Sequence, residues 1–262
     1  MQADLEAAAT RGKFTALASL GYQNPKNSLT LQDHLISRRH YLSYQLTDNY
    51  SVRGGRFLPA FGINTPDHIS ATRQPLGFGQ GLESYNLEGS YIGDKTNIFI
   101  TGILGRPDAM ALDREKGAAV QGAYAIYDKT KLGLSSFYGK NRRGTRTLVG
   151  PYGLISFSDN LVLLTELDFQ FRSPVGQESI AGAVNSQKLS YELRQGFWGF
   201  VTQDWSRQDF KNERTTAQAY GVGLQVFPRP HFEFNLSWQR QKLKAFSEEF
   251  FDYAWLMSHF YF

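Results

Sequence analysis

The sequence predicts an all-β fold: a transmembrane antiparallel up-and-down β-barrel of about 14 strands, within a range of roughly 12–16. Three observations indicate it. Apolar and polar residues alternate along many segments, short turns alternate with longer polar connections, and the composition favours strands over helices. Because no apolar run approaches the roughly 18 residues of a spanning helix, strands would have to cross the membrane.

The composition is rich in aromatic residues and glycine. The chain has 20 Phe, 14 Tyr, 4 Trp and 25 Gly, but only 3 Met and no Cys. Aromatic residues favour strands, and glycine favours the turns between them. The absence of cysteine excludes disulfides and thiolate metal sites and suits an exported protein. The net charge of +4 comes without a stripe of Lys and Arg, so nucleic acid is not an expected partner.

The first eleven residues show no clear alternation and no signal-peptide pattern. We therefore predict an N-terminal periplasmic tail over 1–11 and a transmembrane barrel over 12–262. The first strand of the barrel is expected at 12–22, where Phe14, Leu20 and Tyr22 alternate with polar or small residues, although Leu17 breaks the pattern.

The next strands follow the same rule. In 83–92, Tyr85, Leu87 and Tyr91 alternate with Asn86 and Glu88, which predicts a strand with one apolar and one polar face. Turn residues separate the other segments of this half. The predicted strands after the first are 35–46, 50–58, 83–92, 96–105, 117–127 and 131–139.

The second half of the chain carries the clearest alternation. In 161–172, Leu163 and Leu167 lie on one face, while Glu166 and Asp168 lie on the other. The remaining predicted strands are 147–157, 161–172, 186–194, 197–207, 214–227, 231–241 and 250–262. Most are close to the roughly 9–11 residues that a tilted strand needs to cross a bilayer.

The connections alternate in length. Short turns are expected at 47–49, 93–95, 128–130, 158–160, 194–196 and 227–230, and longer connections at 23–34, 59–82, 106–116, 140–146, 173–185, 208–213 and 242–249. Short periplasmic turns and long external loops are typical of outer-membrane barrels. An even number of strands would place both termini in the periplasm. The alternative is a soluble β-sandwich or lipocalin-like barrel, whose apolar residues would point inward.

The chain ends in SHFYF, and Phe260 and Phe262 share one face of the last predicted strand with Ala254 and Ser258. A terminal Phe with an apolar residue two positions earlier resembles the C-terminal signature of bacterial outer-membrane proteins. That resemblance implies recognition by the barrel-assembly machinery and a place in the outer membrane of a Gram-negative-type cell. We expect Phe260, Phe262 and Trp238 to be membrane-interface anchors. Outer-membrane lipid and lipopolysaccharide are then expected partners.

The polar faces predict the residues of the lumen. About 14 strands would leave a water path narrower than that of barrels with 16–18 strands. The predicted pore-lining residues are Glu88, Glu166, Asp168, Arg172, Lys188, Glu192, Arg194 and Glu233. Their charges are mixed. They could select ions, or they could pair with one another and fill the lumen.

The longest connection, 59–82, is rich in glycine and proline and carries Asp67, His68 and Arg73. Long loops in compact proteins are usually functional, so we expect this one to fold over or into the mouth and constrict it. The alternative is a surface loop that packs on its neighbours.

The sequence therefore predicts a porin-like channel for passive diffusion of small hydrophilic solutes or ions. The alternative is a structural barrel subunit of an envelope complex, which holds a partner protein in its lumen or at its rim and does not conduct. The common catalytic and nucleotide-binding motifs do not occur, and the five His residues have no metal-ligand spacing. We expect no enzymatic activity, no cofactor and no metal.

Overall fold

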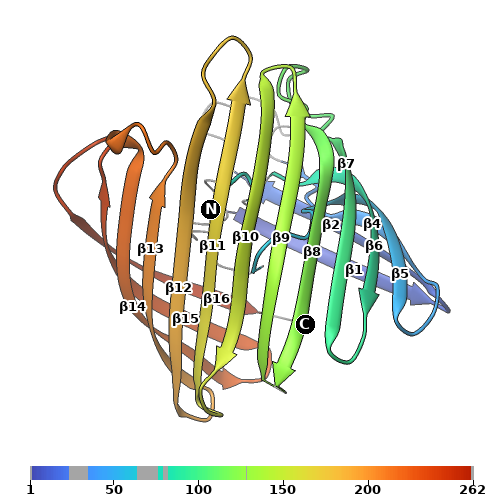
Figure 1. Cartoon of the computed structure of the whole chain (residues 1–262). Helices are drawn as coiled ribbons and strands as arrows, with labels where there is room; N and C mark the ends of the chain where they lie inside the picture. Colours follow the sequence, from blue (N-terminus) through green and yellow to red (C-terminus); the bar gives the residue numbers. More distant parts are fainter. Residues whose placement is uncertain (1, 24–34, 64–75, 79–81, 128, 261–262) are drawn as a thin grey trace.

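The computed structural model describes residues 2–23, 35–63, 76–78, 82–127 and 129–260. It consists of one antiparallel sheet, curled so that β1 and β16 both lie behind the front wall (Figure 1). Fifteen strands follow one another in the order β1-β2-β4 and then in sequence to β16, while the short β3 pairs with β2. In the described part of the chain, no helix is both long enough and apolar enough to cross a membrane.

The strands are β1 Gln2–Arg11, β2 Phe14–Gln23, β3 Leu35–Ile36, β4 His40–Gln45, β5 Tyr50–Phe57, β6 Ser84–Ile92, β7 Thr96–Gly105, β8 Lys116–Tyr127, β9 Thr130–Asn141, β10 Gly144–Ser156, β11 Leu161–Pro174, β12 Ile180–Arg194, β13 Phe197–Arg207, β14 Thr216–Arg229, β15 Phe232–Leu243 and β16 Phe251–Phe260. A 3-10 turn, η1 Glu213–Thr215, precedes β14. Every predicted strand has a counterpart here, and the all-β up-and-down architecture is confirmed.

The predicted tail is wrong, because residues 2–11 form β1. This strand pairs with β2 along its whole length, from Gln2 opposite Gln23 to Arg11 opposite Phe14. Gly12 closes the hairpin with φ of +59°, a left-handed conformation that glycine adopts without strain. Three consecutive alanines, 7–9, conceal the alternation that would have indicated a strand.

The additional strand also changes where the chain begins. Antiparallel neighbours alternate in direction, so the first and last of fifteen strands run the same way. Gln2 and Phe260 therefore lie at opposite ends of the sheet, with Phe260 at the end of the short turns. The expectation that both termini share one side depended on an even number of strands and is not met.

Two predicted long connections are also shorter than expected. The range 140–146 is a tight hairpin around residues 142–143, because β9 and β10 extend the alternation to Asn141 and Gly144. The range 173–185 shrinks because β12 begins at Ile180.

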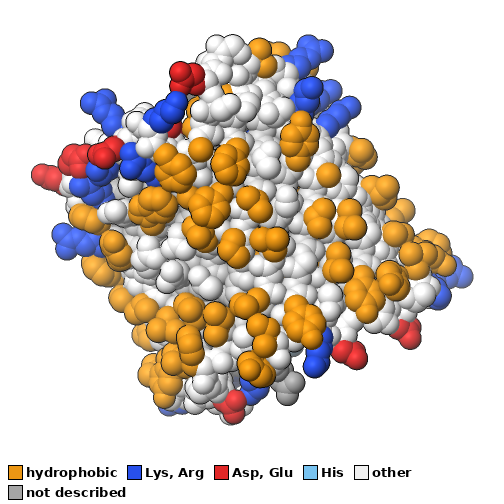
Figure 2. All heavy atoms as spheres, viewed as in Figure 1, with side chains coloured by type: hydrophobic (Ala, Val, Ile, Leu, Met, Phe, Trp, Pro, Cys, Tyr) orange, Lys and Arg blue, Asp and Glu red, His pale blue; other side chains and the backbone are white. Residues whose placement is uncertain are grey.

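The side chains alternate in exposure as the sequence pattern predicts. Leu87 on β6 is 62% exposed on the outer face, whereas its neighbour Glu88 is 2% exposed and points inward. Figure 2 shows hydrophobic side chains over the middle of the visible surface and charged side chains gathered toward its upper and lower edges. Exposed aromatic rings lie close to the short turns, as in the interfacial girdle of membrane barrels: Phe14, Tyr50, Tyr127, Phe157 and Phe227.

The predicted membrane anchors occupy different depths. Trp238 is exposed on the outer face, opposite Val222 and Ala254, but it lies near the middle of β15 rather than at an end. Its position on the outer face agrees with the prediction, and its place at the membrane interface stays a prediction. Phe260 pairs with Phe232 at the end of the short turns, and Phe262 lies outside the described residues.

The wall is low where the strands are short. β4 has 6 residues and β5 has 8, against 14 for β11 and 15 for β12 (Figure 1, right). The outer face of this low wall carries a groove of about 520 Å³. Small outward residues border much of it: Ala7, Ala9, Ala16, Ala18 and Gly54. Because these strands are short, the apolar band that faces the lipid is narrower here than on the rest of the wall.

Candidate functional site

The connection between β5 and β6 packs inside the barrel. Phe61 and Phe78 stack with their ring centroids 4.6 Å apart, and Phe78 meets Phe137 of β9 edge-on at 5.2 Å. The resulting buried cluster consists of Phe61, Leu76, Phe78, Ile103, Ala119, Phe137, Leu148 and Val184. The described parts of this loop thus cover inward residues of β7–β10 and β12 with an apolar core, which is unusual in a lumen. Asp67, His68 and Arg73 lie outside the described residues.

Hydrogen bonds fix the loop at Gly62. The Gly62 amide donates to Ser135 Oγ at 2.8 Å, and Gln121 Nε2 donates to the Gly62 carbonyl at 2.6 Å. The next amide, of Ile63, donates to Glu166 Oε2 at 3.0 Å. Gly62 has φ of +57°, and a Cβ there would lie 1.6 Å from Glu166 Oε1. With the Glu166 side chain in this position, only glycine leaves room for the close approach of the loop to the wall.

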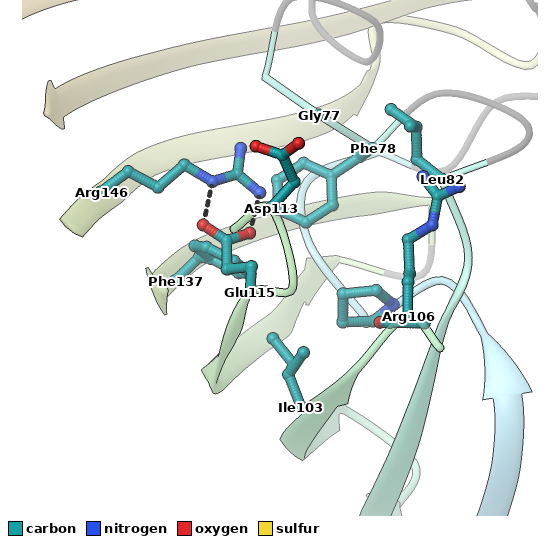
Figure 3. A pocket seen from close by; sticks show the side chains of 11 residues that line it. Gly77, Phe78, Leu82, Ile103, Arg106, Asp113, Glu115, Phe137 and Arg146 are labelled. Atoms are coloured by element: carbon teal, nitrogen blue, oxygen red, sulfur yellow. Dashed lines mark hydrogen bonds and ion pairs between the residues drawn. The ribbon is translucent and has the colours of Figure 1, made fainter. Parts of the chain in front are cut away.

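A second attachment holds the other side of the loop. Arg146 on β10 forms a bidentate ion pair with Glu115, at 2.8 and 2.7 Å, and donates to the carbonyl of Leu76. Its guanidinium lies 4.5 Å from the centroid of Phe137. These groups border a cavity of about 190 Å³, in which Arg146 and Glu115 face Phe78 (Figure 3). The cavity is lined by residues of the loop, of the 106–115 connection and of the barrel wall.

The 106–115 connection is fixed by a carboxylate between two guanidinium groups. Asp108 lies 3.0 Å from Arg56 and 3.3 Å from Arg106. Burial by itself raises the pKa of Asp108, but the hydrogen bond from Arg106 and the charge of Arg56 outweigh it and hold the pKa below its usual value. A lowered pKa stabilises the fold above the unfolded-state pKa, and this stabilisation is lost as the pH falls through the folded-state pKa.

Glu88 is the centre of a polar ladder across three strands. Arg53 Nε on β5 donates to Glu88 Oε1 at 2.7 Å, and Thr101 Oγ1 on β7 donates to Glu88 Oε2 at 2.7 Å. The Arg53 guanidinium also lies 4.1 Å from the centroid of Phe57. A carboxylate with a charged partner and a hydroxyl donor can stay ionised in a buried position.

Glu166 and Asp168 point inward but do not form an open acidic wall. They are 4% and 0% exposed, respectively. Glu166 accepts the loop amide, and a Cβ at Gly150 would lie 2.1 Å from Asp168 Oδ1. Glu192, another of the predicted pore-lining residues, lies near the turn between β12 and β13, where it accepts from the Gly196 amide at 3.1 Å. Alternation predicts that these side chains point inward, but it does not predict the loop that covers them.

The other predicted lumen residues are spread along the barrel. Lys188 Nζ lies 4.1 Å from the centroid of Phe200, and Arg172 donates to the Gln208 carbonyl at 3.2 Å. Glu233 is buried and accepts from Gln225 at 2.7 Å. Arg194 lies next to a short turn, over Phe197, rather than at mid-depth. The structure therefore brings Glu88 and Glu166 into contact networks but does not gather the eight residues into one ring.

Sequence reasoning missed Arg146, Glu115, Ser135 and Gln121. Arg146 was assigned to an outer loop, although it shares its parity with Leu148 and Tyr152 and so extends the inward face of β10. Ser135 and Gln121 are neutral and gave no charge signal. Among the described residues, no group of three or more His, Asp and Glu side chains is placed to hold a metal ion.

No family model matches the chain, and no curated protein matches it significantly. Solved structures do resemble it. OmpT, an outer membrane protein of Vibrio cholerae in its trimer form, gives a TM-score of 0.72 at 8% identity, covering 92% of this chain and 80% of that one.

Two further structures give similar values. The outer membrane channel DcaP of Acinetobacter baumannii gives a TM-score of 0.65 at 10% identity, covering 99% of this chain and 84% of the other. An anion-selective porin from Comamonas acidovorans gives 0.62 at 14% identity, covering 92% and 79%. The chain therefore has the fold of an outer-membrane β-barrel of the porin type.

Proposed function

We propose that this protein is a channel for passive diffusion of small hydrophilic solutes or ions across the outer membrane of a Gram-negative-type cell. One observation carries the proposal: the wall of the barrel is apolar outside and polar inside, and a loop is fixed against the inner wall. The likeness to porins and to the channel DcaP supports it at the level of fold. The short turns would face the periplasm.

Transport of this kind needs no covalent step. The inward polar groups replace part of the hydration of a passing solute, while charge and width sort the solutes. The loop attached at Gly62 and Arg146 removes part of the cross-section on the side of β7–β12. In this proposal the protein is not an enzyme, and the loop is its constriction.

The second candidate is a structural subunit that holds a partner protein and conducts nothing. The low wall of β4 and β5 and the groove beside it favour this alternative. Small outward residues let another protein backbone approach closely, as they do between membrane helices. A partner docked there would cover the part of the wall that offers lipid the least apolar height.

Planar-bilayer recording separates the two candidates. We expect the purified protein to insert as discrete ohmic steps, because a polar lumen conducts ions whether or not a partner is bound outside. Insertion into the bilayer, checked by protease protection in matched liposomes, without any conductance step would contradict the channel and favour the structural role.

A further inference from the structure

The lumen face of β14–β16 differs from the rest of the wall because its inward positions carry no charge over most of their length. Register and alternation give these positions. They are Ala217, Ala219, Gly221, Gly223 and Gln225 on β14, Asn235, Ser237, Gln239 and Gln241 on β15, and Phe251, Tyr253, Trp255 and Met257 on β16. By contrast, Arg53, Glu88, Arg146, Glu166 and Asp168 lie on the inward faces of β5, β6, β10 and β11.

Three aromatic rings form a ladder on the inward face of β16. The ring centroids of Phe251 and Tyr253 are 6.5 Å apart, and those of Tyr253 and Trp255 are 5.1 Å apart with the planes 20° from parallel. These residues oppose Gln241, Gln239 and Ser237 of β15, while the intervening Leu256 is 66% exposed on the outer face. The ladder therefore lies on the lumen side.

Neither membrane anchoring nor the buried core accounts for this ladder. Aromatic anchors belong on the lipid face, where Trp238 and Phe234 of the neighbouring strand already point. The apolar cluster under the loop is built on β7–β10 and β12. Phe251 remains 43% exposed, and Tyr253 and Trp255 are half-buried, so apolar ring surface faces the lumen. Such surface costs free energy in water and is usually retained for binding.

Amide and hydroxyl groups run beside the rings. The Tyr253 hydroxyl donates to Gln239 Oε1, which ties the ladder to β15. Gly223 on β14 makes room for a side chain of β13: a Cβ at Gly223 would lie 2.3 Å from Cζ of Phe200, so the Phe200 ring lies over β14. Lys188 Nζ lies 4.1 Å from the centroid of that ring, so the rings offered to a solute are those of β16. Gly223 is opposite Ser237, and Ser237 is opposite Trp255, so neutral hydrogen-bonding groups lie beside these rings.

We infer that this face is a binding track for neutral polyhydroxylated solutes, that is, for sugar rings. The C–H face of a sugar packs on an aromatic ring, and its hydroxyls pair with amides that can both donate and accept. Uncharged groups avoid the desolvation cost that a row of ions would add. The inference rests on the proposed function and extends it to a class of solute.

Maltotriose is the probe, and Trp255→Ala and Trp238→Ala are the matched variants, because these two Trp residues lie on adjacent strands and face opposite sides. We expect saturable binding, measured by isothermal titration calorimetry in detergent micelles, with the wild type and with Trp238→Ala. With Trp255→Ala the dissociation constant should rise about tenfold, the size expected for loss of one stacked ring. Trp255→Phe keeps a ring and should restore most of the affinity.

The same protein in a planar bilayer gives the second measurement, which is reduction of the ion current by maltotriose. Conductance without any saturable response to maltotriose would overturn the track and leave the channel intact. Equal weakening by Trp238→Ala and Trp255→Ala would also overturn it. Maltotriose binding by a barrel that does not conduct would overturn the channel and leave the track intact.

Discussion

Replacing Gly62 by alanine is expected to raise the single-channel conductance by roughly twofold or more, because width sets the current through a polar lumen. Gly62 is the point where the loop meets the wall. Its amide and carbonyl are paired with Ser135 and Gln121, and the adjacent Ile63 amide binds Glu166. A methyl group there would lie 1.6 Å from the Glu166 carboxylate, so either the loop or that carboxylate has to move, and either movement breaks the bond between Glu166 and the Ile63 amide.

Gly176→Ala is the matched control. Gly176 has φ of +73°, so alanine is strained there as at position 62, but its Cβ would meet no heavy atom within 4 Å. Each left-handed alanine costs about 1 kcal/mol. Both variants therefore carry the same backbone strain, but the added methyl group meets the Glu166 carboxylate in Gly62→Ala alone. Planar-bilayer recording of both variants decides the matter, and an unchanged conductance for Gly62→Ala would show that the loop does not limit the path.

The second large effect concerns stability. Arg53→Ala removes the charged partner of Glu88, whose carboxylate is 2% exposed and, among the described residues, keeps the hydrogen bond from Thr101 alone. Breaking a buried ion pair on one side costs about 3–5 kcal/mol, and the remaining hydroxyl donor favours the lower end of that range. Urea unfolding in detergent micelles, followed by tryptophan fluorescence, measures the change in the free energy of unfolding.

The double variant Arg53→Met with Glu88→Met is the control for that experiment. It replaces both charges by apolar side chains of similar length, which often leaves stability nearly unchanged. We therefore expect the double variant to unfold closer to the wild type than Arg53→Ala does. If both variants unfolded at the wild-type urea concentration, Glu88 would be hydrated by lumen water rather than stabilised by Arg53.

Much of the fold could be predicted because a strand has a strict period of two. Alternation in 161–172 and 231–241 places β11 and β15 within two residues of their observed ends, and it assigns the face of each side chain. β1 escaped prediction because its alanines carry no polarity signal, so only pairing with β2 reveals it.

The site could be predicted less well, because its geometry arises from contacts between distant segments. Alternation shows that Glu166 points inward, but not that a loop about a hundred residues earlier in the chain binds it, with Ile63 donating to its carboxylate. The role of Arg146 depends on Glu115 and on the carbonyl of Leu76, and no local pattern links these three residues. The alternation of polar and apolar residues therefore predicts which side chains point inward, but not which residues they bind.

The direction of the side chains in β15 decides whether the apolar face of the barrel lies in the membrane. The printed sequence contains no cysteine, so single cysteines at positions 234–241 can each carry one nitroxide label in lipid vesicles. We expect labels at 234, 236, 238 and 240 to collide mainly with oxygen dissolved in the lipid. Labels at 235, 237, 239 and 241 should collide mainly with a water-soluble nickel chelate. Equal accessibility at all eight positions, or the opposite alternation, would contradict a barrel with its apolar face in the membrane.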